Sequence, residues 1–317
     1  MVQTYGKKPT RMGYGDGLLT LGETDPRVVV FDADLAKSTT TDWFAEKFPT
    51  RFFDAGIAEQ NMLGMAAGMS LLGKVPFVST YGVFVAGRAW DQIRTTICYS
   101  KLNVKIGGMH GGVSVGPDGA THQALEEISI MRVLPNMTVL SPCDYHESYQ
   151  ATLAAAQIAG PVYLRFGREA VPIITTPETP FEIGKAALRR EGNDVALLAT
   201  GHMVYHALAA AEALAGEGVN ALVLNVHTIK PLDEEAVLAA VAQCGCAVTC
   251  EEHQVTGGFG GAIAELLAKR RPTPLRFIGV QDRFGESGQP DELFAEFGLS
   301  APFIVAAARE VMQAAKK

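Results

Sequence analysis

Glu59 is a carboxyl group among apolar residues, a combination that could take part in proton transfer. It lies in the stretch Arg51 to Gly68, RFFDAGIAEQNMLGMAAG, close to the apolar residues Ala58 and Met62. A carboxylate in such company loses hydration, so its protonated form is favoured and it could hold or share a proton near neutral pH. The alternative is a solvated position at the start of a helix, where the helix dipole favours an acid.

Two aromatic residues one helical turn apart, Tyr81 and Phe84, follow an apolar run. Packing in the core is one explanation of this spacing. The other is a wall for a flat heterocycle, because offset stacking of rings adds binding energy beyond simple burial.

The segment 107–122, GGMHGGVSVGPDGATH, contains six glycines, one proline, and the polar residues His110, Asp118 and His122. This composition predicts a loop whose backbone approaches something closely. The segment has no cysteine and no His-x-His spacing, which argues against a metal site. His122 could also simply begin the next helix.

Three arginines are candidates for binding an anionic group such as a phosphate, since guanidinium groups form paired, charge-assisted hydrogen bonds. Arg165 and Arg168 flank an expected strand end, where binding groups collect in α/β proteins. Arg88 lies in FVAGRAWDQIR and could instead be an exposed helix residue.

The elements that must position these residues alternate between short apolar runs and helical patterns, which predicts parallel strands joined by helical crossovers. The expected strands are 28–31, one beginning at 52–53, 75–79, 104–107, 138–140 and 162–165. The expected helices are 12–22, 61–72, 86–99, 122–133 and 145–159. A functional site is then expected at the carboxyl ends of the strands.

Three prolines in 171–182 predict a linker between two domains, 1–175 and 183–317. The second domain repeats the α/β pattern, so we expect two mainly parallel sheets flanked by helices. Its expected strands are 195–199, 221–226, 247–249 and 275–278, and its expected helices are 204–214, 234–241 and 259–268.

The composition indicates which kinds of partner and which cellular compartment are compatible with this chain. A net charge of -7 argues against nucleic acid or an anionic membrane as the main partner. No apolar run is long enough for a membrane helix, and the first residues lack a signal-peptide pattern, so we expect a cytoplasmic protein. Five scattered cysteines suggest no disulfide framework, and the pair His202 and His206 lacks a third metal ligand.

Several motifs together resemble the transketolase family. DAGIAEQN, STYGVFVAGRAWDQIR and PDGATHQ are similar to its pyrimidine-binding domain. TGHMVYHALAAAEAL, KPLD, EEHQVTGGFGGAIAELL and DRFGESG are similar to its C-terminal domain. The resemblance covers nearly the whole chain and implies thiamine diphosphate as the cofactor.

This resemblance also implies roles for the candidate residues. Glu59 would bond the aminopyrimidine ring of the cofactor, which Tyr81, Phe84 and Ile57 would also contact. Asp118, His122 and Arg168 would bind the sugar phosphate, with Arg88 and Arg165 as further candidates. His110 lies where transketolases have a histidine near the substrate carbonyl, so the expected catalytic residues are Glu59, His122 and His110.

The family's GDG motif, which carries the metal and the diphosphate, is missing. Gly15-Asp16-Gly17 is not that motif, because no asparagine follows before Asn61, and Asp16 is expected to be an exposed helix residue. The resemblance therefore implies an N-terminal partner subunit that carries the GDG motif and holds most of the contacts to Mg²⁺ or Ca²⁺. A homodimer or a heterotetramer is expected.

The function implied is the C-terminal subunit of a split transketolase, which transfers a two-carbon ketol unit from a ketose phosphate to an aldose. Two related activities remain open: the beta subunit of a 2-oxoacid dehydrogenase and a deoxyxylulose-phosphate synthase-like enzyme. The alternative outside enzymology is a silent scaffold subunit, which would bind no thiamine diphosphate.

Overall fold

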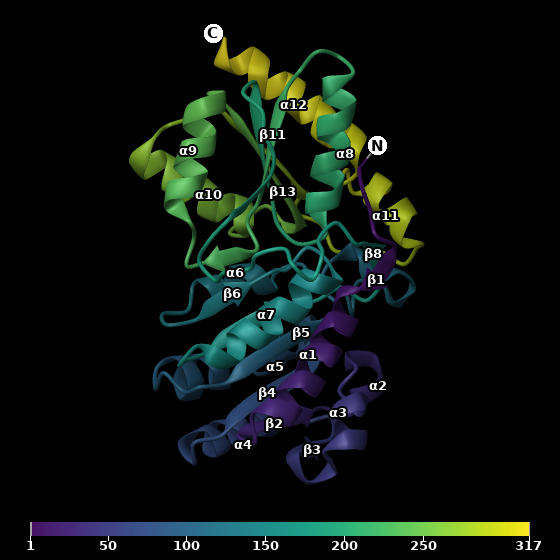
Figure 1. Ribbon diagram of the computed structural model, residues 1–317, viewed down its shortest axis with the longest axis vertical. Helices are drawn as coiled ribbons and strands as arrows, with labels where there is room; N and C mark the ends of the chain where they lie inside the picture. The colour runs from purple at the N-terminus through teal and green to yellow at the C-terminus, as the bar shows by residue number, and fades with distance from the viewer. Residues whose placement is uncertain (1, 317) are drawn as a thin grey trace.

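A seven-stranded sheet forms the core of the first domain in the computed structural model, which describes residues 2–316 (Figure 1). The strand order is β12-β6-β7-β5-β4-β2-β3. The strands are β2 (Val28–Asp32), β3 (Phe52–Asp54), β4 (Val75–Tyr81), β5 (Lys105–Met109), β6 (Thr138–Leu140), β7 (Val162–Arg165) and β12 (Thr228–Lys230). Every neighbouring pair is parallel except β12 with β6, so the predicted parallel sheet is confirmed.

Helices cover both faces of this sheet. One face packs against α1 (Thr10–Thr24) and α7 (Tyr145–Gln157), and the other against α4 (Glu59–Leu71), α5 (Gly82–Arg88), the π-helix η2 (Gln92–Cys98) and α6 (Glu127–Arg132). Val28 and Val30 join the core on the α1 side, whereas Val29 and Phe31 join the core on the α4 side. Successive strand residues point to opposite faces, so a sheet covered on both faces needs the unbroken apolar run that the sequence displays.

The second domain has a five-stranded sheet of order β14-β13-β10-β11-β9, in which only β9 is antiparallel to its neighbour. Its strands are β9 (Ala187–Arg190), β10 (Val195–Ala199), β11 (Ala221–Asn225), β13 (Ala247–Gln254) and β14 (Leu275–Val280). Its helices are α8 (Met203–Ala215), α9 (Glu234–Cys244), α10 (Phe259–Arg270), α11 (Pro290–Glu296) and α12 (Ala301–Ala315). Figure 1 shows α9 and α10 on one side of this sheet and α8 and α12 on the other. The predicted two-domain α/β class is confirmed.

Two predicted helices are wrong in their bounds. The helix expected over 86–99 is divided into α5 and η2, and the helix expected over 122–133 begins only at Glu127, as α6. The residues before α6 form the 3-10 helix η3 (Val113–Asp118) and a turn in which the His122 N–H donates to the carbonyl of Gly119 at 3.0 Å. Glycines with positive φ at 112, 116 and 119 hold the backbone out of the α-helical region here.

Some elements were not predicted at all. They are β1 (Lys7–Pro9), β8 (Ala170–Pro172), α2 (Ala36–Thr39), α3 (Asp42–Lys47), the 3-10 helix η1 (Pro49–Arg51), η3, β9, β12, α11 and α12. Most of them have seven residues or fewer, which is too short for a hydrophobic period to show. The long exception is α12, whose Ile304, Val305 and Val311 face the second core.

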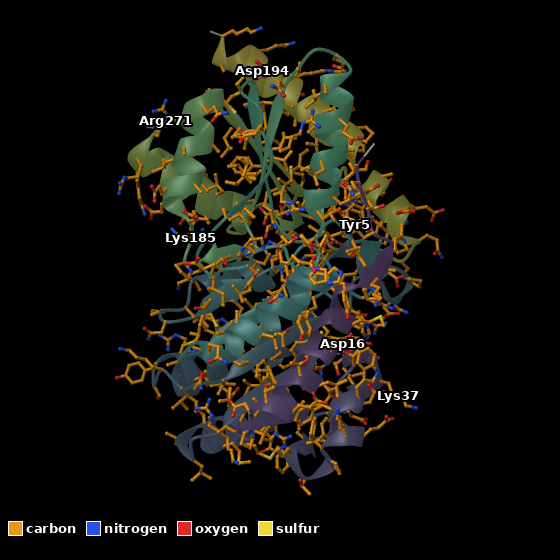
Figure 2. All side chains as sticks on the ribbon, viewed as in Figure 1. Tyr5, Asp16, Lys37, Lys185, Asp194 and Arg271 are labelled. Carbon is orange, nitrogen blue, oxygen red and sulfur yellow. The ribbon has the colours of Figure 1, made fainter. Side chains whose placement is uncertain are left out.

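The predicted linker is held in place at its start. Its first residues belong to β8, which pairs antiparallel with β1. The carboxylate of Asp144, the N-cap of α7, accepts hydrogen bonds from the N–H groups of Ile174 (2.8 Å) and Thr175 (2.7 Å). Tyr5 lies beside the junction of the two domains and donates its N–H to the carbonyl of Ile173 at 2.9 Å (Figure 2).

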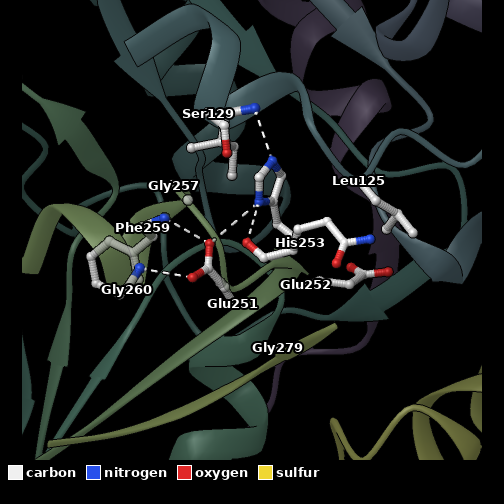
Figure 3. A network of polar contacts seen from close by, with 12 residues as sticks. Leu125, Ser129, Glu251, Glu252, His253, Gly257, Phe259, Gly260 and Gly279 are labelled. Atoms are coloured by element: carbon white, nitrogen blue, oxygen red, sulfur yellow. Dashed lines mark hydrogen bonds and ion pairs between the residues drawn. The ribbon is translucent and has the colours of Figure 1, made fainter. Parts of the chain in front are cut away.

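Buried polar contacts fasten the two domains together in what we call the interdomain joint, made of Glu127, Arg165, Glu251, Glu252 and His253. Arg165 donates from Nε to the carboxylate of Glu127 at 2.5 Å and from Nη2 to the carbonyl of Glu252 at 2.7 Å. The N–H of Ile128 donates to Nε2 of His253 at 3.2 Å. On the side of the second domain, Glu251 accepts the N–H groups of Phe259 and Gly260 at the start of α10, both at 2.7 Å (Figure 3).

Within residues 2–316, no helix has the length and apolar character needed to cross a membrane.

Candidate active site

The candidate residues gather at the carboxyl edge of the seven-stranded sheet. β3, β4, β5 and β7 run parallel, so the segments that follow Asp54, Tyr81, Met109 and Arg165 leave the sheet at the same edge. These segments carry Glu59, Phe84, the glycine-rich loop and Arg168. We use the name cleft for these residues and their neighbours at this edge, because the carboxyl edge is where parallel α/β sheets bind ligands.

Glu59 is the first residue of α4 and is only 4% exposed. Its carboxylate pairs with Arg88, whose Nη1 lies 2.8 Å from Oε1. The turn before α4 requires φ of +68° at Gly56, and Ile57 in that turn is 74% exposed. The structure therefore combines both interpretations of the sequence: Glu59 lies at a helix start, yet water has little access to it.

Tyr81 and Phe84 form an aromatic wall. Tyr81 ends β4 and Phe84 lies in α5, with ring centroids 5.6 Å apart and planes inclined by 14°. The guanidinium carbon of Arg88 lies 4.1 Å from the centroid of the Phe84 ring. A Cβ built at Gly87 would meet no atom within 4 Å, so the space beside this wall is open.

His110 extends the wall. Its ring stacks on Tyr81 at 3.8 Å with an angle of 20°, and its backbone has a positive φ of 59°, which is uncommon outside glycine. Burial, followed by the charges of Arg11 and Arg168, lowers the pKa of His110 to about 3. The imidazole is therefore neutral at neutral pH, and its buried Nδ1 has no hydrogen-bond partner among the described residues.

His122 approaches the same wall from the side. Its ring is edge-on to Tyr81 at 5.7 Å and to Phe84 at 5.4 Å, and its Nδ1 lies 2.8 Å from Oγ1 of Thr121. The structure thus brings Tyr81, Phe84, His110 and His122 into one aromatic cluster. These four residues are too far apart in the sequence for their spacing alone to predict the cluster.

The three predicted arginines have different surroundings. Arg168 pairs with Asp118, with Nη1 2.9 Å from Oδ1, and both side chains are 31% exposed. Arg88 pairs with Glu59 as described above. Arg165 is 7% exposed and its guanidinium is engaged within the interdomain joint, so its observed contacts are those of a residue that fastens domains.

The glycine-rich loop does approach something closely, and that is the second domain. A Cβ on Gly112 would lie 2.2 Å from the carboxyl group of Glu252, and one on Gly119 would lie 2.5 Å from Oγ of Ser287. The N–H of Ser114 also donates to Glu252, at 2.6 Å. The loop is therefore pressed against the second domain while His110 and Asp118 remain at the cleft.

Arg11 is a site residue that the sequence did not reveal. Its Nη1 donates to the carbonyl of Ser38 at 2.6 Å, while its Nε is buried without a hydrogen-bond partner among the described residues. The charges of Arg11 and Arg168 both lower the pKa of His110, because these groups lie close together. The only available signal was a lone arginine at the start of a helix, which is too common to single out.

The described residues contain no group of three or more His, Cys, Asp or Glu side chains placed to hold a metal ion. Gly15-Asp16-Gly17 lies inside α1, as predicted. Asp16, however, is half-buried and accepts a hydrogen bond from the hydroxyl of Tyr145 at 2.5 Å, so the expectation of an exposed residue is wrong. His202 and His206 lie in a ring cluster with Phe294.

Comparison with known proteins gives matches over both domains. The family model for the transketolase pyrimidine-binding domain matches residues 6–173, and the model for the transketolase C-terminal domain matches residues 184–304. The chain is 46% identical over 303 residues to the 6-deoxy-6-sulfo-D-fructose transketolase subunit of Clostridium sp. (strain MSTE9), covering 95% of this chain and 93% of that protein.

Two further relatives also match over nearly their whole length. An apulose-4-phosphate transketolase subunit from Phocaeicola vulgatus is 36% identical over 304 residues, covering 96% of this chain and 97% of that protein. A solved structure described as a split gene transketolase, inactive beta4 tetramer, has a TM-score of 0.91 and 47% identity, covering 96% of this chain and 98% of that chain.

Proposed function

Because this chain belongs to the transketolase family, among its split C-terminal subunits, we propose that it works with an N-terminal subunit to transfer a ketol unit. The donor proposed is a ketose phosphate, the acceptor is an aldose or its phosphate, and the cofactor is thiamine diphosphate. The N-terminal subunit would supply the GDG motif and most of the contacts to the diphosphate and the metal ion.

The residues present fit the pyrimidine end of the cofactor. The Arg88 guanidinium, which is a flat cation, donates an N–H group to the Glu59 carboxylate. It lies at the same time over the Phe84 ring. An aminopyrimidine ring needs the same two partners, a carboxyl group at its edge and an aromatic ring at its face. This observation carries the proposal.

Bound thiamine diphosphate would supply an electron sink for breaking the carbon–carbon bond beside a ketone. The task of Glu59 would be to hold a proton on its carboxyl group and donate it in a hydrogen bond to the pyrimidine ring nitrogen. Tyr81 and Phe84 would fix the plane of the ring, and the exposed Ile57 would lie against it. Burial keeps water away from Glu59, which favours this hydrogen bond over solvation.

The polar residues of the cleft would bind and orient the sugar. Arg168 and Arg11 would pair with the phosphate, since Arg11 retains a buried Nε without a hydrogen-bond partner among the described residues. His110, which is neutral, would together with His122 hydrogen-bond the carbonyl and hydroxyl oxygens and move protons there, and Asp118 would accept from a hydroxyl group. We do not assign Arg165 to the substrate, because its guanidinium is taken up by the interdomain joint.

Self-association is proposed through the surface around α4. Large apolar side chains are exposed there and nearby, at Ile57 (74%), Leu71 (74%), Leu72 (78%) and Tyr99 (86%). Exposed apolar side chains mark an interface where they form a contiguous patch, and the adjacent Leu71 and Leu72 would be the centre of it. A second copy of this chain or the N-terminal subunit would cover them.

The test is an activity assay of the chain mixed with an N-terminal transketolase subunit, thiamine diphosphate and Mg²⁺. Ketose phosphates are offered as donors in one series and pyruvate in another. Ketol transfer from a ketose phosphate supports the proposal, whereas turnover of pyruvate alone points to a deoxyxylulose-phosphate synthase-like or 2-oxoacid dehydrogenase activity. Failure to bind thiamine diphosphate in the mixture points to a silent scaffold.

A further inference from the structure

Arg88 contacts both Glu59 and Phe84, the two residues that would bind the pyrimidine ring in the proposed function. Its Nη1 is 2.8 Å from the carboxylate of Glu59, and its guanidinium carbon is 4.1 Å from the centroid of Phe84. A guanidinium is planar, has N–H donors at its edge and stacks on aromatic rings. The pyrimidine ring cannot take its place until this side chain leaves.

We propose that Arg88 is a displaceable gate of the pyrimidine site. It holds Glu59 as a carboxylate and covers Phe84 until the pyrimidine ring takes over both contacts. The proposal rests on the proposed function, because it assumes that Glu59 and Phe84 receive this ring.

The surroundings of Arg88 allow it to move. Its side chain is 51% exposed, compared with 5% for Glu59, so its outer half is already in water. It is the last residue of α5, and the neighbouring Gly87 leaves open space beside it. Arg88 therefore returns to water when it leaves, and the incoming ring takes its place as the partner of the buried Glu59.

Displacement of Arg88 changes the charge that Glu59 can carry. A buried carboxylate without a cation or a donor is strongly disfavoured. A hydrogen bond to an unprotonated ring nitrogen also needs a hydrogen on the carboxyl oxygen. When Arg88 moves into water, Glu59 therefore takes up one proton from the solvent, and binding of the cofactor is coupled to that proton.

The neighbouring charged groups do not replace Arg88. The elements packed against α4 are α5, η2, β2 and β4, and their charged residues include Arg94 on η2 and Asp32 on β2. Asp32 is buried and accepts hydrogen bonds from Thr39 and Thr41. His122 faces the edge of the Phe84 ring and is the other group that could exchange a proton during binding. The test must separate its contribution from that of Glu59.

The experiment is calorimetric titration of thiamine diphosphate with Mg²⁺ into the chain assembled with an N-terminal transketolase subunit. Two buffers with different ionisation enthalpies give the protons taken up per site. The proteins compared are the wild type, Arg88→Met, Arg88→Lys, Glu59→Gln and the control Arg94→Met, which removes an exposed arginine from η2.

We expect the wild type and Arg94→Met to take up about one proton per site, because Glu59 changes from carboxylate to carboxylic acid. Arg88→Met should take up far less, since its Glu59 is already protonated, and should bind about three- to fivefold tighter. Arg88→Lys keeps the charge and should retain the uptake. Glu59→Gln should abolish it, and any uptake that remains there belongs to His122.

Equal proton uptake in Arg88→Met and the wild type would overturn the gate while leaving the proposed function intact. Weaker binding by Arg88→Met would do the same, because it would mean that Arg88 supports the ring instead of yielding to it. Absence of binding by the wild-type assembly would overturn the proposed function and the gate together. Thermal unfolding of each variant shows whether it is folded.

Discussion

The cleft and the interdomain joint both contain an arginine paired with a glutamate, but their environments are opposite. In the joint, Arg165 is 7% and Glu127 is 1% exposed, whereas in the cleft Arg88 is 51% and Glu59 is 5% exposed. Removing Arg165 leaves the charge of Glu127 sealed without its cation, which is costly, whereas Arg88 already faces water and can leave when another partner takes its place at Glu59. The sealed pair fixes Arg165 where it also reaches the carbonyl of Glu252 in the second domain, and the open pair can exchange its partner.

The same contrast between a buried and a partly exposed ion pair separates Arg165 from Arg168, which are only three residues apart. Arg165 ends β7 with its side chain inside the joint, while Arg168 lies beyond the strand and pairs with Asp118 on the exposed side. The glycine-rich loop spans both regions, because Gly112 presses against Glu252 while His110 and Asp118 stay at the cleft. Predictions for the two regions can therefore be compared within one short part of the chain.

Arg165→Met should have the largest effect. It leaves Glu127 buried without its cation, so we expect a loss of about 3–5 kcal/mol in the free energy of unfolding. Arg168→Met, three residues along, is the matched control and should lose less than about 1 kcal/mol. Urea unfolding followed by circular dichroism measures both, and equal losses would remove the distinction between joint and cleft.

Glu59→Gln should reduce turnover by about 100-fold or more, because a group that positions and supplies a proton is lost. Its stability should stay close to that of the wild type, since the amide keeps the size of the side chain. The measurement is steady-state turnover with the N-terminal subunit present, paired with thermal unfolding. Normal turnover in a folded variant would contradict the role proposed for Glu59.

Arg168→Ala should raise KM for a ketose phosphate about tenfold, because one charge-assisted hydrogen bond to the phosphate is lost. KM for the corresponding unphosphorylated ketose should change little, and kcat should be close to that of the wild type. Equal effects on both substrates would show that Arg168 acts by holding Asp118 and not by binding phosphate.

The smallest effect concerns pH. The folded pKa of His110 is about 3, below the value of 6.5 that it has when unfolded, so its contribution to stability is complete above pH 6.5 and is lost as the pH falls. Between pH 6 and 5, His110→Phe should lose about 1 kcal/mol less stability than the wild type. Phenylalanine retains the stacking on Tyr81. Parallel stability curves for the two proteins would mean that His110 does not contribute to the acid sensitivity.

Residues whose environment is local could be predicted from the sequence. The strands Thr138–Leu140, Val162–Arg165 and Val195–Ala199 have the predicted bounds, because a sheet covered on both faces requires a short, unbroken apolar run. The carboxyl edge as the location of the cleft followed from the parallel order alone.

Residues whose environment is made by distant parts of the chain could not be predicted. Arg165 and Arg168 look alike in the sequence, and only the approach of Glu127 and Glu252 from elsewhere separates them. Arg11 joins the cleft because α1 begins beside His110, across about a hundred residues of sequence. The glycines of the loop indicated a close contact, but nothing in the loop itself identified the second domain as the other side of it.

The strand β12 has a practical consequence for anyone who wishes to study the first domain alone. Thr228–Lys230 comes from beyond the predicted linker, yet it pairs with β6 and forms the last strand of the first sheet. A fragment cut at the linker would expose the hydrogen-bonding groups of β6 as a bare edge strand, which invites aggregation. Truncation studies should therefore keep residues 228–230, or replace β6 with a sequence that is less prone to aggregate.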